Sequence, residues 1–167
     1  MDSIVLTDDR PKAIEVLIGV PKTPSPSSPL ISANISALEE GRERIARRIA
    51  REILPGLGVN IGIGIPTRIP KYIHRDIGVN IHSENGVIGI EGYPGIGESD
   101  PDMINAGCET VCVSPGASFF SSSDAFGMVR GGHLDITVLG ALQVSSKGDL
   151  ANWIVPGKMM NGMGRAM

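Results

Sequence analysis

A single carboxylate, Glu84, stands between an alternating apolar stretch and an Asn-Gly dipeptide in the segment NIHSENGVIGIEGYP, residues 80–94. Ile77, Val79 and Ile81 alternate with other residues, as in a strand with one buried face. Asn-Gly is the strongest short-range signal for a two-residue hairpin turn. These residues leave two interpretations open. Glu84 is either a solvated flank of a hairpin or a reactive carboxylate held on a rigid turn.

Glycines alternate with larger residues in the segment LGVNIGIGIP, residues 57–66, which we predict to be a strand. One face of this strand is β-branched, and the other carries Gly58, Gly62 and Gly64. Glycine weakens a strand unless something approaches its backbone closely. The neighbour is either a helix packed across the sheet or a ligand or loop. G-x-G by itself predicts no nucleotide site, since the full G-x-G-x-x-G pattern is missing.

The two cysteines do not form a metal-binding pattern. Cys108 and Cys112 are four residues apart in AGCETVCVS, with no further cysteine and no nearby histidine. On a strand they would share one face, with Thr110 between them, so we interpret them as core thiols. Two free thiols suit a reducing compartment, and no metal site is predicted.

The first 35 residues differ from the rest of the chain. Four prolines follow one another closely in PKTPSPSSPL, at Pro21, Pro24, Pro26 and Pro29. Proline fixes φ and removes a backbone donor, which favours an extended linker with neither helix nor central strand. Residues 1–35 are therefore predicted to be a poorly ordered leader or linker, and residues 36–167 to be the folded domain.

The domain is expected to open with a helix. Ser36 and Glu39 form an S-x-x-E capping box, Ile45 and Ile49 continue an apolar stripe at helical spacing, and Pro55-Gly56 ends the segment. Its many arginines are matched by glutamates, so the segment has a net charge of only about +1, which is typical of a solvated, ion-paired face.

Further elements alternate downstream. In chain order we expect a loop leading to a short helix capped by Asp100 or Asp102, a strand over 109–115, a helix capped within 122–124 and ending at 131–132, a buried strand over 134–145, and a turn at 146–149. Alternating strands and helices predict an α/β fold with an open layered sheet and flanking helices.

Composition agrees with this class and excludes others. The 167 residues are 41% hydrophobic but only 4% aromatic, with a net charge of −3, which suits closely packed α/β layers. The charge gives no footprint for nucleic acid or an anionic membrane. No stretch reaches the roughly 18 apolar residues of a membrane span, and the acidic N-terminus resembles neither a secretory signal nor a transit peptide.

Six blocks in order resemble the B half, or beta chain, of the family I coenzyme A transferases. They are NIGIGIP, SENG, INAGCETV, PGASFFSS, RGGHLDITVLGALQVSSKGDLANWIVPGK and GMGRAM, spread over residues 38–167. The likeness is to members that use 3-oxo acids. It implies an α/β domain of the NagB/RpiA-like type. Because the family's B half continues for several more strands and helices, it also implies a C-terminally incomplete domain.

The resemblance implies the chemistry of Glu84. The family's glutamate in S-E-N-G is the nucleophile that receives CoA from succinyl-CoA as a glutamyl-CoA thioester and passes it to a 3-oxo acid such as acetoacetate, a step of ketone body catabolism. Coenzyme A is then a substrate, and no permanently bound cofactor is expected. Covalent catalysis of this kind divides one difficult exchange into easier steps.

The resemblance also assigns neighbouring residues. Asn85, Gly86 and the turn containing Gly62 and Gly64 would shape the pocket around the nucleophile, and Gly162 and Gly164 would lie against the CoA thioester. Arg165 stands where the family has a glycine whose amide contributes to the oxyanion hole. An arginine there adds a Cβ, restricts φ and brings a long cation to the reacting centre.

Partners and compartment follow from the same likeness. The family works as paired A and B halves, so an A half, as a separate polypeptide or fused domain, and an oligomer are expected. The compartment would be the mitochondrial matrix for a eukaryotic source and the cytoplasm otherwise. Two other functions stay open: an acyl-CoA hydrolase on the same scaffold, or an inactive fragment that only pairs with a partner.

Overall fold

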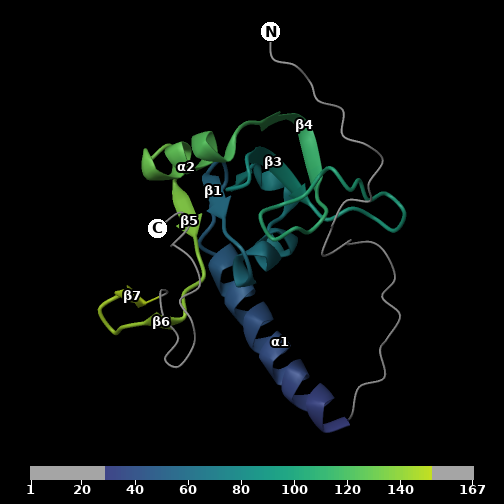
Figure 1. Cartoon of the computed structure of the whole chain (residues 1–167), viewed down its shortest axis with the longest axis vertical. Coiled ribbons are helices and arrows are strands. Elements are labelled where there is room, and N and C mark those ends of the chain that lie inside the picture. The colour runs from purple at the N-terminus through teal and green to yellow at the C-terminus, as the bar shows by residue number, and fades with distance from the viewer. Residues whose placement is uncertain (1–28, 152–167) are drawn as a thin grey trace.

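The computed structural model describes residues 29–151, with the side chains of residues 37–74 and 76–151, and shows an open sheet with helices on its outside (Figure 1). The sheet has five strands in the order β4-β3-β2-β1-β5. Their bounds are β1 Gly58–Ile61, β2 Asn80–Ser83, β3 Val87–Gly92, β4 Cys112–Phe119 and β5 Ile136–Val138. The predicted α/β class with an open layered sheet is confirmed.

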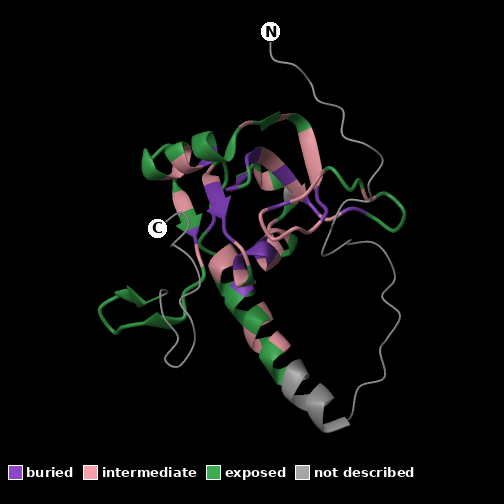
Figure 2. Ribbon diagram, viewed as in Figure 1, coloured by how far each residue is buried: buried purple, intermediate pink, exposed green. Residues whose placement is uncertain are grey.

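The central strand β1 runs parallel to both β2 and β5, whereas β3 and β4 add antiparallel pairs on one side. Its side chains alternate, so Val59 and Ile61 point to the face opposite Asn60. The first two belong to the hydrophobic core with Ile81 and Ile69, and this buried centre lies between the sheet and the helices below it (Figure 2).

Helix α1 spans Pro29–Ala50, which is earlier at both ends than the sequence predicts. Backbone N–H groups in the first turn of a helix have no partner within the helix, so the missing N–H of Pro29 does not prevent it from beginning α1. The prediction of a linker without helix is therefore wrong for residues 29–35. Beyond Ala50 the chain tightens into i→i−3 hydrogen bonds, with Glu52 N donating to Ile49 O at 2.9 Å, before it turns at Pro55.

The charged face of α1 is ion-paired, as expected. Arg42 contacts Glu39 at 2.7 Å, and Arg48 pairs with Glu52. A 3₁₀ helix that the sequence did not predict, η1 (Ile65–Tyr72), packs against α1 and contributes further cations to it. It starts because Gly64, with φ 90° and ψ −126°, turns the chain, so the predicted strand over 57–66 stops at Ile61.

A second short 3₁₀ helix, η2 (Arg75–Ile77), shortens the strand predicted before Glu84. Gly78 follows it in the left-handed region at φ 67°. The alternation of apolar residues from Ile77 to Ile81 therefore spans a helix end and a strand start, and β2 begins only at Asn80.

The antiparallel edge also differs from the prediction. β4 begins at Cys112 and continues through Pro115 to Phe119, because an edge strand with register shifts tolerates a proline that has no donor. The helix expected after Asp100 is absent from this described segment, where Asp102 N instead donates to Asp100 Oδ1 at 2.9 Å in a turn.

The cysteines are not on one strand. Cys108 lies in a turn with a left-handed φ of 59°, Cys112 begins β4, and both are half-buried free thiols. The shared strand face predicted for them is wrong.

Helix α2 (Ser122–Arg130) confirms the expected short helix. The cap predicted within 122–124 is wrong by one residue, because Ser121 is the N-cap and accepts a hydrogen bond from Asp124 N at 3.1 Å. The long buried strand predicted over 134–145 is divided: β5 joins the main sheet, and β6 (Gln143–Val144) pairs with β7 (Leu150–Ala151) in a hairpin that projects away from the sheet (Figures 1 and 2). The turn expected at 146–149 closes that hairpin.

No helix in the described part of the chain is both long and apolar enough to span a membrane.

Candidate active site

Three parallel strands end at one edge of the sheet. Ile61, Ser83 and Val138 are aligned in one row of the hydrogen-bond register. Gly62 and Glu84 directly follow this row at the ends of β1 and β2, so both lie at the same edge of the sheet. Ligand sites of open α/β sheets lie at the carboxyl ends of the strands, so this edge is the candidate site.

The surroundings of Gly62 show what approaches the glycine face of β1. An ideal Cβ at Gly62 would lie 3.0 Å from Leu139 Cδ2 and 3.1 Å from Val138 O. The close neighbour is therefore the end of β5 rather than a helix. Gly64 has open space around its Cβ position and owes its place to its positive φ. Gly64 therefore forms the turn, and Gly62 accommodates the close approach.

Glu84 is a central residue of the turn rather than its flank. Gly86 N donates to Ser83 O at 3.0 Å, which places Glu84 and Asn85 in the middle of a β-turn. Ser83 and Val87 are the last register partners of β2 and β3, so three residues connect the strands. The predicted two-residue Asn-Gly turn is wrong, because Gly86 at φ 108° supplies the left-handed position that closes a three-residue connection.

The burial of Glu84 excludes a solvated hairpin flank. Its residue is only 5% exposed, whereas Asn85 beside it is exposed. A buried carboxylate has lost most of its water, which raises its free energy unless the site compensates for it. Asn85 fixes the other side of the turn, because its Nδ2 donates to Ile104 O at 2.8 Å.

Gly86 is locked against the start of α2. Its carbonyl accepts a hydrogen bond from Phe120 N at 2.9 Å, and a Cβ at this position would lie 2.0 Å from Phe120 O. A residue with a side chain therefore cannot occupy position 86 without moving the backbone of residue 120. The turn that carries Glu84 is held at both of its ends.

A polar brace supports the turn from the core side of the sheet. Ser83 Oγ, 1% exposed, accepts a hydrogen bond from Ala106 N at 2.9 Å. Asn105 Oδ1 in turn accepts from Gly107 N at 2.8 Å, and its Nδ2 donates to Glu109 Oε2 at 2.9 Å. This brace ties the loop after Ile104 to the residue before Glu84.

Tyr93 completes the brace from β3. Its hydroxyl lies 2.5 Å from Thr67 O and 3.0 Å from Glu109 Oε2, so it ties η1 to the same loop. Burial, together with the negative charge of Glu109, raises the pKa of Tyr93 well above its usual value of 10.0 and keeps the phenol protonated. Sequence analysis missed these residues, since no local pattern connects positions so far apart in the chain.

A second buried polar group lies on the other face of the two central strands. Asn60 and His82 are register partners, each 0% exposed, and Asn60 Oδ1 lies 2.8 Å from His82 Nδ1. The imidazole stacks on Phe120 with ring centroids 5.6 Å apart, and burial lowers its pKa below 6.5. In the sequence, each of these two residues stands at a polar position that alternates with the apolar residues of its strand, which gives no signal that the pair is buried.

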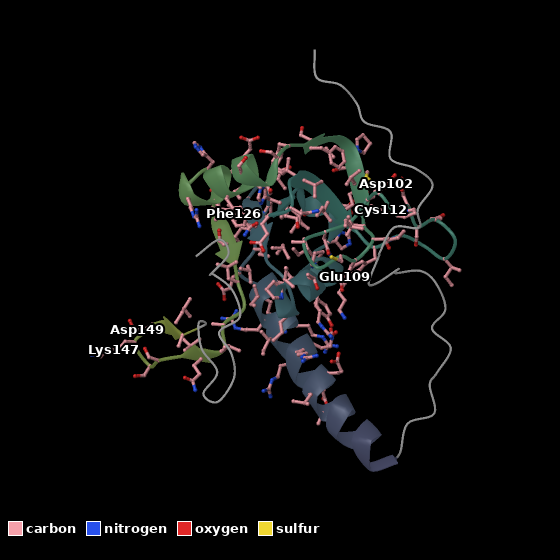
Figure 3. All side chains as sticks on the ribbon, viewed as in Figure 1. Asp102, Glu109, Cys112, Phe126, Lys147 and Asp149 are labelled. Atoms are coloured by element: carbon pink, nitrogen blue, oxygen red, sulfur yellow. The ribbon has the colours of Figure 1, made fainter. Side chains whose placement is uncertain are left out.

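Two hollows flank this edge of the sheet. One, of about 240 Å³, is lined by Asn85 and Gly86 together with apolar side chains that include Ile104 and Phe119. The other, of about 390 Å³, is lined by residues of the Gly64 turn and by Arg42, Arg68 and Glu109. Figure 3 labels Glu109 near the junction of the sheet with α1, on the side away from α2.

Among the residues predicted for the site, the structure brings Gly62, Glu84, Asn85 and Gly86 together, with Gly64 in the adjoining turn. Gly162, Gly164 and Arg165 lie outside the described residues.

Known proteins of one family are similar to this chain. The model of the family described as Coenzyme A transferase matches residues 42–167. The mitochondrial succinyl-CoA:3-ketoacid coenzyme A transferase 2 of Homo sapiens is 52% identical over 129 residues, which is 77% of this chain and 25% of that protein. The B subunit of succinyl-CoA:3-ketoacid coenzyme A transferase from Helicobacter pylori (strain ATCC 700392 / 26695) is 58% identical over 92 residues, 54% of this chain and 44% of that protein.

A solved acyl-CoA transferase from E. coli O157:H7, in a thioester complex with CoA, has the same fold over 71% of this chain and 20% of its own, with a TM-score of 0.52 and 24% identity. The chain thus spans less than half the length of each of these three proteins. The family match covers most of the chain, including the turn that carries Glu84. This chain belongs to the coenzyme A transferase family.

Proposed function

We propose that this chain provides the catalytic glutamate of a CoA-transferase that moves CoA from succinyl-CoA to a 3-oxo acid such as acetoacetate. The observation that carries the proposal is the position of Glu84, 5% exposed, on a turn fixed at both ends at the carboxyl edge of the parallel strands. The names of the human and Helicobacter pylori relatives support the choice of donor and acceptor class.

The chemistry assigned to Glu84 is covalent transfer. A carboxylate oxygen attacks the thioester carbonyl, the C–S bond breaks, and a mixed anhydride forms with CoA thiolate as the leaving group. The thiolate then attacks the glutamyl carbonyl and expels succinate, which leaves a glutamyl-CoA thioester. A 3-oxo acid reverses both steps and departs as its CoA ester, so that Glu84 is regenerated.

The geometry suits these steps in two ways. A carboxylate in bulk water is a weak nucleophile, and burial at the sheet edge removes part of its hydration. Fixed hydrogen bonds on both sides of the turn restrict the directions from which Glu84 can attack, which lowers the entropic part of the barrier. Asn85, Gly86, Gly62 and Gly64 are assigned to the walls of the pocket. Gly162 and Gly164 are assigned to the CoA thioester by family likeness.

An A half is the proposed partner. The Helicobacter pylori relative is named as a B subunit, and this chain matches only part of each relative. We assign it the mitochondrial matrix if its source is eukaryotic, because the human relative is named as mitochondrial, and the cytoplasm if its source is bacterial.

The test combines transfer with trapping of the intermediate. The chain is mixed with the A half that partners the Helicobacter pylori relative, succinyl-CoA and acetoacetate, and the formation of acetoacetyl-CoA is followed by absorbance. With acyl-CoA alone, hydroxylamine should convert the glutamyl thioester into a hydroxamate that peptide mass spectrometry locates at Glu84. Glu84→Gln should lose both signals, with transfer falling on the order of 10³-fold.

Glu91→Gln is the matched control, because this half-buried glutamate lies on β3 and outside the Glu84 turn. It should transfer CoA like the parent. Release of free CoA without acetoacetyl-CoA would replace the proposal with a hydrolase, and an inactive parent would favour a chain that only pairs with a partner. Activity in Glu84→Gln equal to that of the parent would overturn the role of Glu84.

A further inference from the structure

The buried pair formed by Asn60 and His82 is not used by the proposed reaction. Both residues are 0% exposed and share one hydrogen bond of 2.8 Å. Within residues 29–151, Asn60 Nδ2 and His82 Nε2 are buried polar atoms that have no hydrogen-bond partner. Whichever way the Asn60 amide is oriented, the pair keeps one unused donor and one unused acceptor.

Such a pair is unfavourable for folding. A half-satisfied buried polar group destabilises a core more than apolar side chains of the same shape would. On the other face of the same two strands, the register partners Val59 and Ile81 are apolar and belong to the hydrophobic core. A local departure from good packing is expected where function requires it. Here it lies within two residues of the proposed nucleophile.

The contacts of His82 lead to the turn that carries Glu84. The imidazole stacks on Phe120 with an interplanar angle of 16°. Phe120 N donates to Gly86 O at 2.9 Å, so the residue that the imidazole touches also holds the end of the turn. Through the backbone, His82 precedes Ser83 and Glu84 at the end of β2. His82 therefore supports the turn both through the strand and through the stacked ring.

We propose that His82, held by Asn60 and stacked on Phe120, is a positioning residue that fixes the Glu84 turn for attack on the thioester. This inference rests on the proposed function of Glu84. Its physical basis is that a displacement of about 1 Å in a reacting group can lower a rate by up to about 10²-fold. The pair touches no substrate in this assignment. The pair limits the movement of the Glu84 turn relative to β2 and to the start of α2.

The decisive variant is His82→Phe, which keeps a ring for stacking on Phe120 and removes the bond to Asn60. It is measured in the complex with the A half, by the kcat and KM of CoA transfer, and alone by urea unfolding. We expect kcat to fall about 10- to 100-fold with KM within about twofold of the parent. The urea midpoint should fall modestly, because Asn60 stays buried without its hydrogen-bond partner. A purely structural role would instead lower kcat only in proportion to the fraction of folded protein, which the urea curve gives.

Asn60→Ala and the double variant test whether the two residues act as one unit. Asn60→Ala should lower kcat as His82→Phe does, and the double variant should be no slower than the slower single variant within about twofold. Tyr72→Phe is the control: its hydroxyl bonds to Glu43 between η1 and α1, so its loss should lower the urea midpoint and leave kcat unchanged.

The outcomes separate the two proposals. If the parent forms no hydroxamate at Glu84 and transfers no CoA, the proposed function fails and this inference fails with it. If the parent is active and His82→Phe keeps its kcat within twofold, only the inference is overturned. It is also overturned if kcat falls only in step with the fraction of folded protein, or if the effects of Asn60→Ala and His82→Phe simply multiply.

Discussion

Gly86 and Phe120 lie so close that a Cβ on residue 86 would be 2.0 Å from the Phe120 carbonyl oxygen, while Phe120 N donates to Gly86 O at 2.9 Å. Gly86 also has a φ of 108°, which residues with a side chain rarely adopt. Two independent features therefore require a glycine at position 86. It closes the turn, and it lets α2 begin directly against the residue that follows the Glu84–Asn85 pair.

Replacing Gly86 by alanine is expected to destabilise the chain. Gly86→Ala combines a strained φ with a backbone clash, so the free energy of unfolding should fall by about 2–4 kcal/mol, measured by urea denaturation. Gly97→Ala is the matched control, because Gly97 has φ 82° but open space at its Cβ position. It should cost only about 1 kcal/mol. Equal losses in the two variants would show that contact with Phe120 contributes nothing.

Removing the Ser83 hydroxyl should loosen the loop that supports the turn containing Glu84. Ser83→Ala leaves the N–H of the half-buried Ala106 without its acceptor, which should lower the free energy of unfolding by about 1 kcal/mol. Native-state hydrogen exchange should show faster exchange at Ala106 in particular. Unchanged exchange of that amide, with the stability loss still present, would contradict the assigned bond.

Glu43 should give a pH-dependent contribution to stability. Lys71, with Tyr72 and Arg68, lowers the pKa of this carboxyl from 4.5 to about 2. Because its pKa is lower in the folded state, the stabilisation is fully present above about pH 4.5 and is lost as the pH falls towards about 2. Glu43→Gln should therefore reduce the free energy of unfolding by about 1 kcal/mol near pH 7, since solvent screens a partly exposed network.

The difference between the parent and Glu43→Gln should shrink when urea denaturation is repeated near pH 3. Glu52→Gln is the comparison, because Glu52 pairs with Arg48 on the exposed side of α1 with its side chain 63% exposed. That variant should change the stability by no more than about 0.5 kcal/mol. A difference in the free energy of unfolding between the parent and Glu43→Gln that stays constant down to about pH 3 would contradict the lowered pKa of Glu43.

His82 should make the chain less stable in mild acid. Burial lowers its pKa below 6.5, so the unfolded chain binds the proton more readily than the folded chain. The stability is then complete above about pH 6.5 and falls as the pH drops from there, by at most about 1.4 kcal/mol per pH unit for one proton. His82→Phe should show a flatter profile between about pH 6.5 and 5. Parallel profiles would refute this.

Elements whose signals are local could be predicted from the order of residues alone. The helix with the arginine and glutamate face, the helix capped beside Asp124 and the turn before Asp149 depend on neighbours only a few residues away, and each is present. Glu84 could also be singled out, because family likeness rests on short blocks in order. Element boundaries were less secure: Pro29 begins a helix, and Pro115 lies inside an edge strand, since proline is tolerated where no donor is required.

The surroundings of Glu84, in contrast, emerge only when the whole domain packs. Its burial, the position of Gly62 at the same sheet edge and the bond between Ser83 and Ala106 all depend on segments that are distant in the chain. The apolar run after Leu134 likewise divides, because β5 pairs with β1 while Val144 pairs with Leu150 in a separate hairpin. Periodicity reports which residues can face a core, but the register between strands and the hydrogen bonds between loops determine which residues meet, and these depend on tertiary packing.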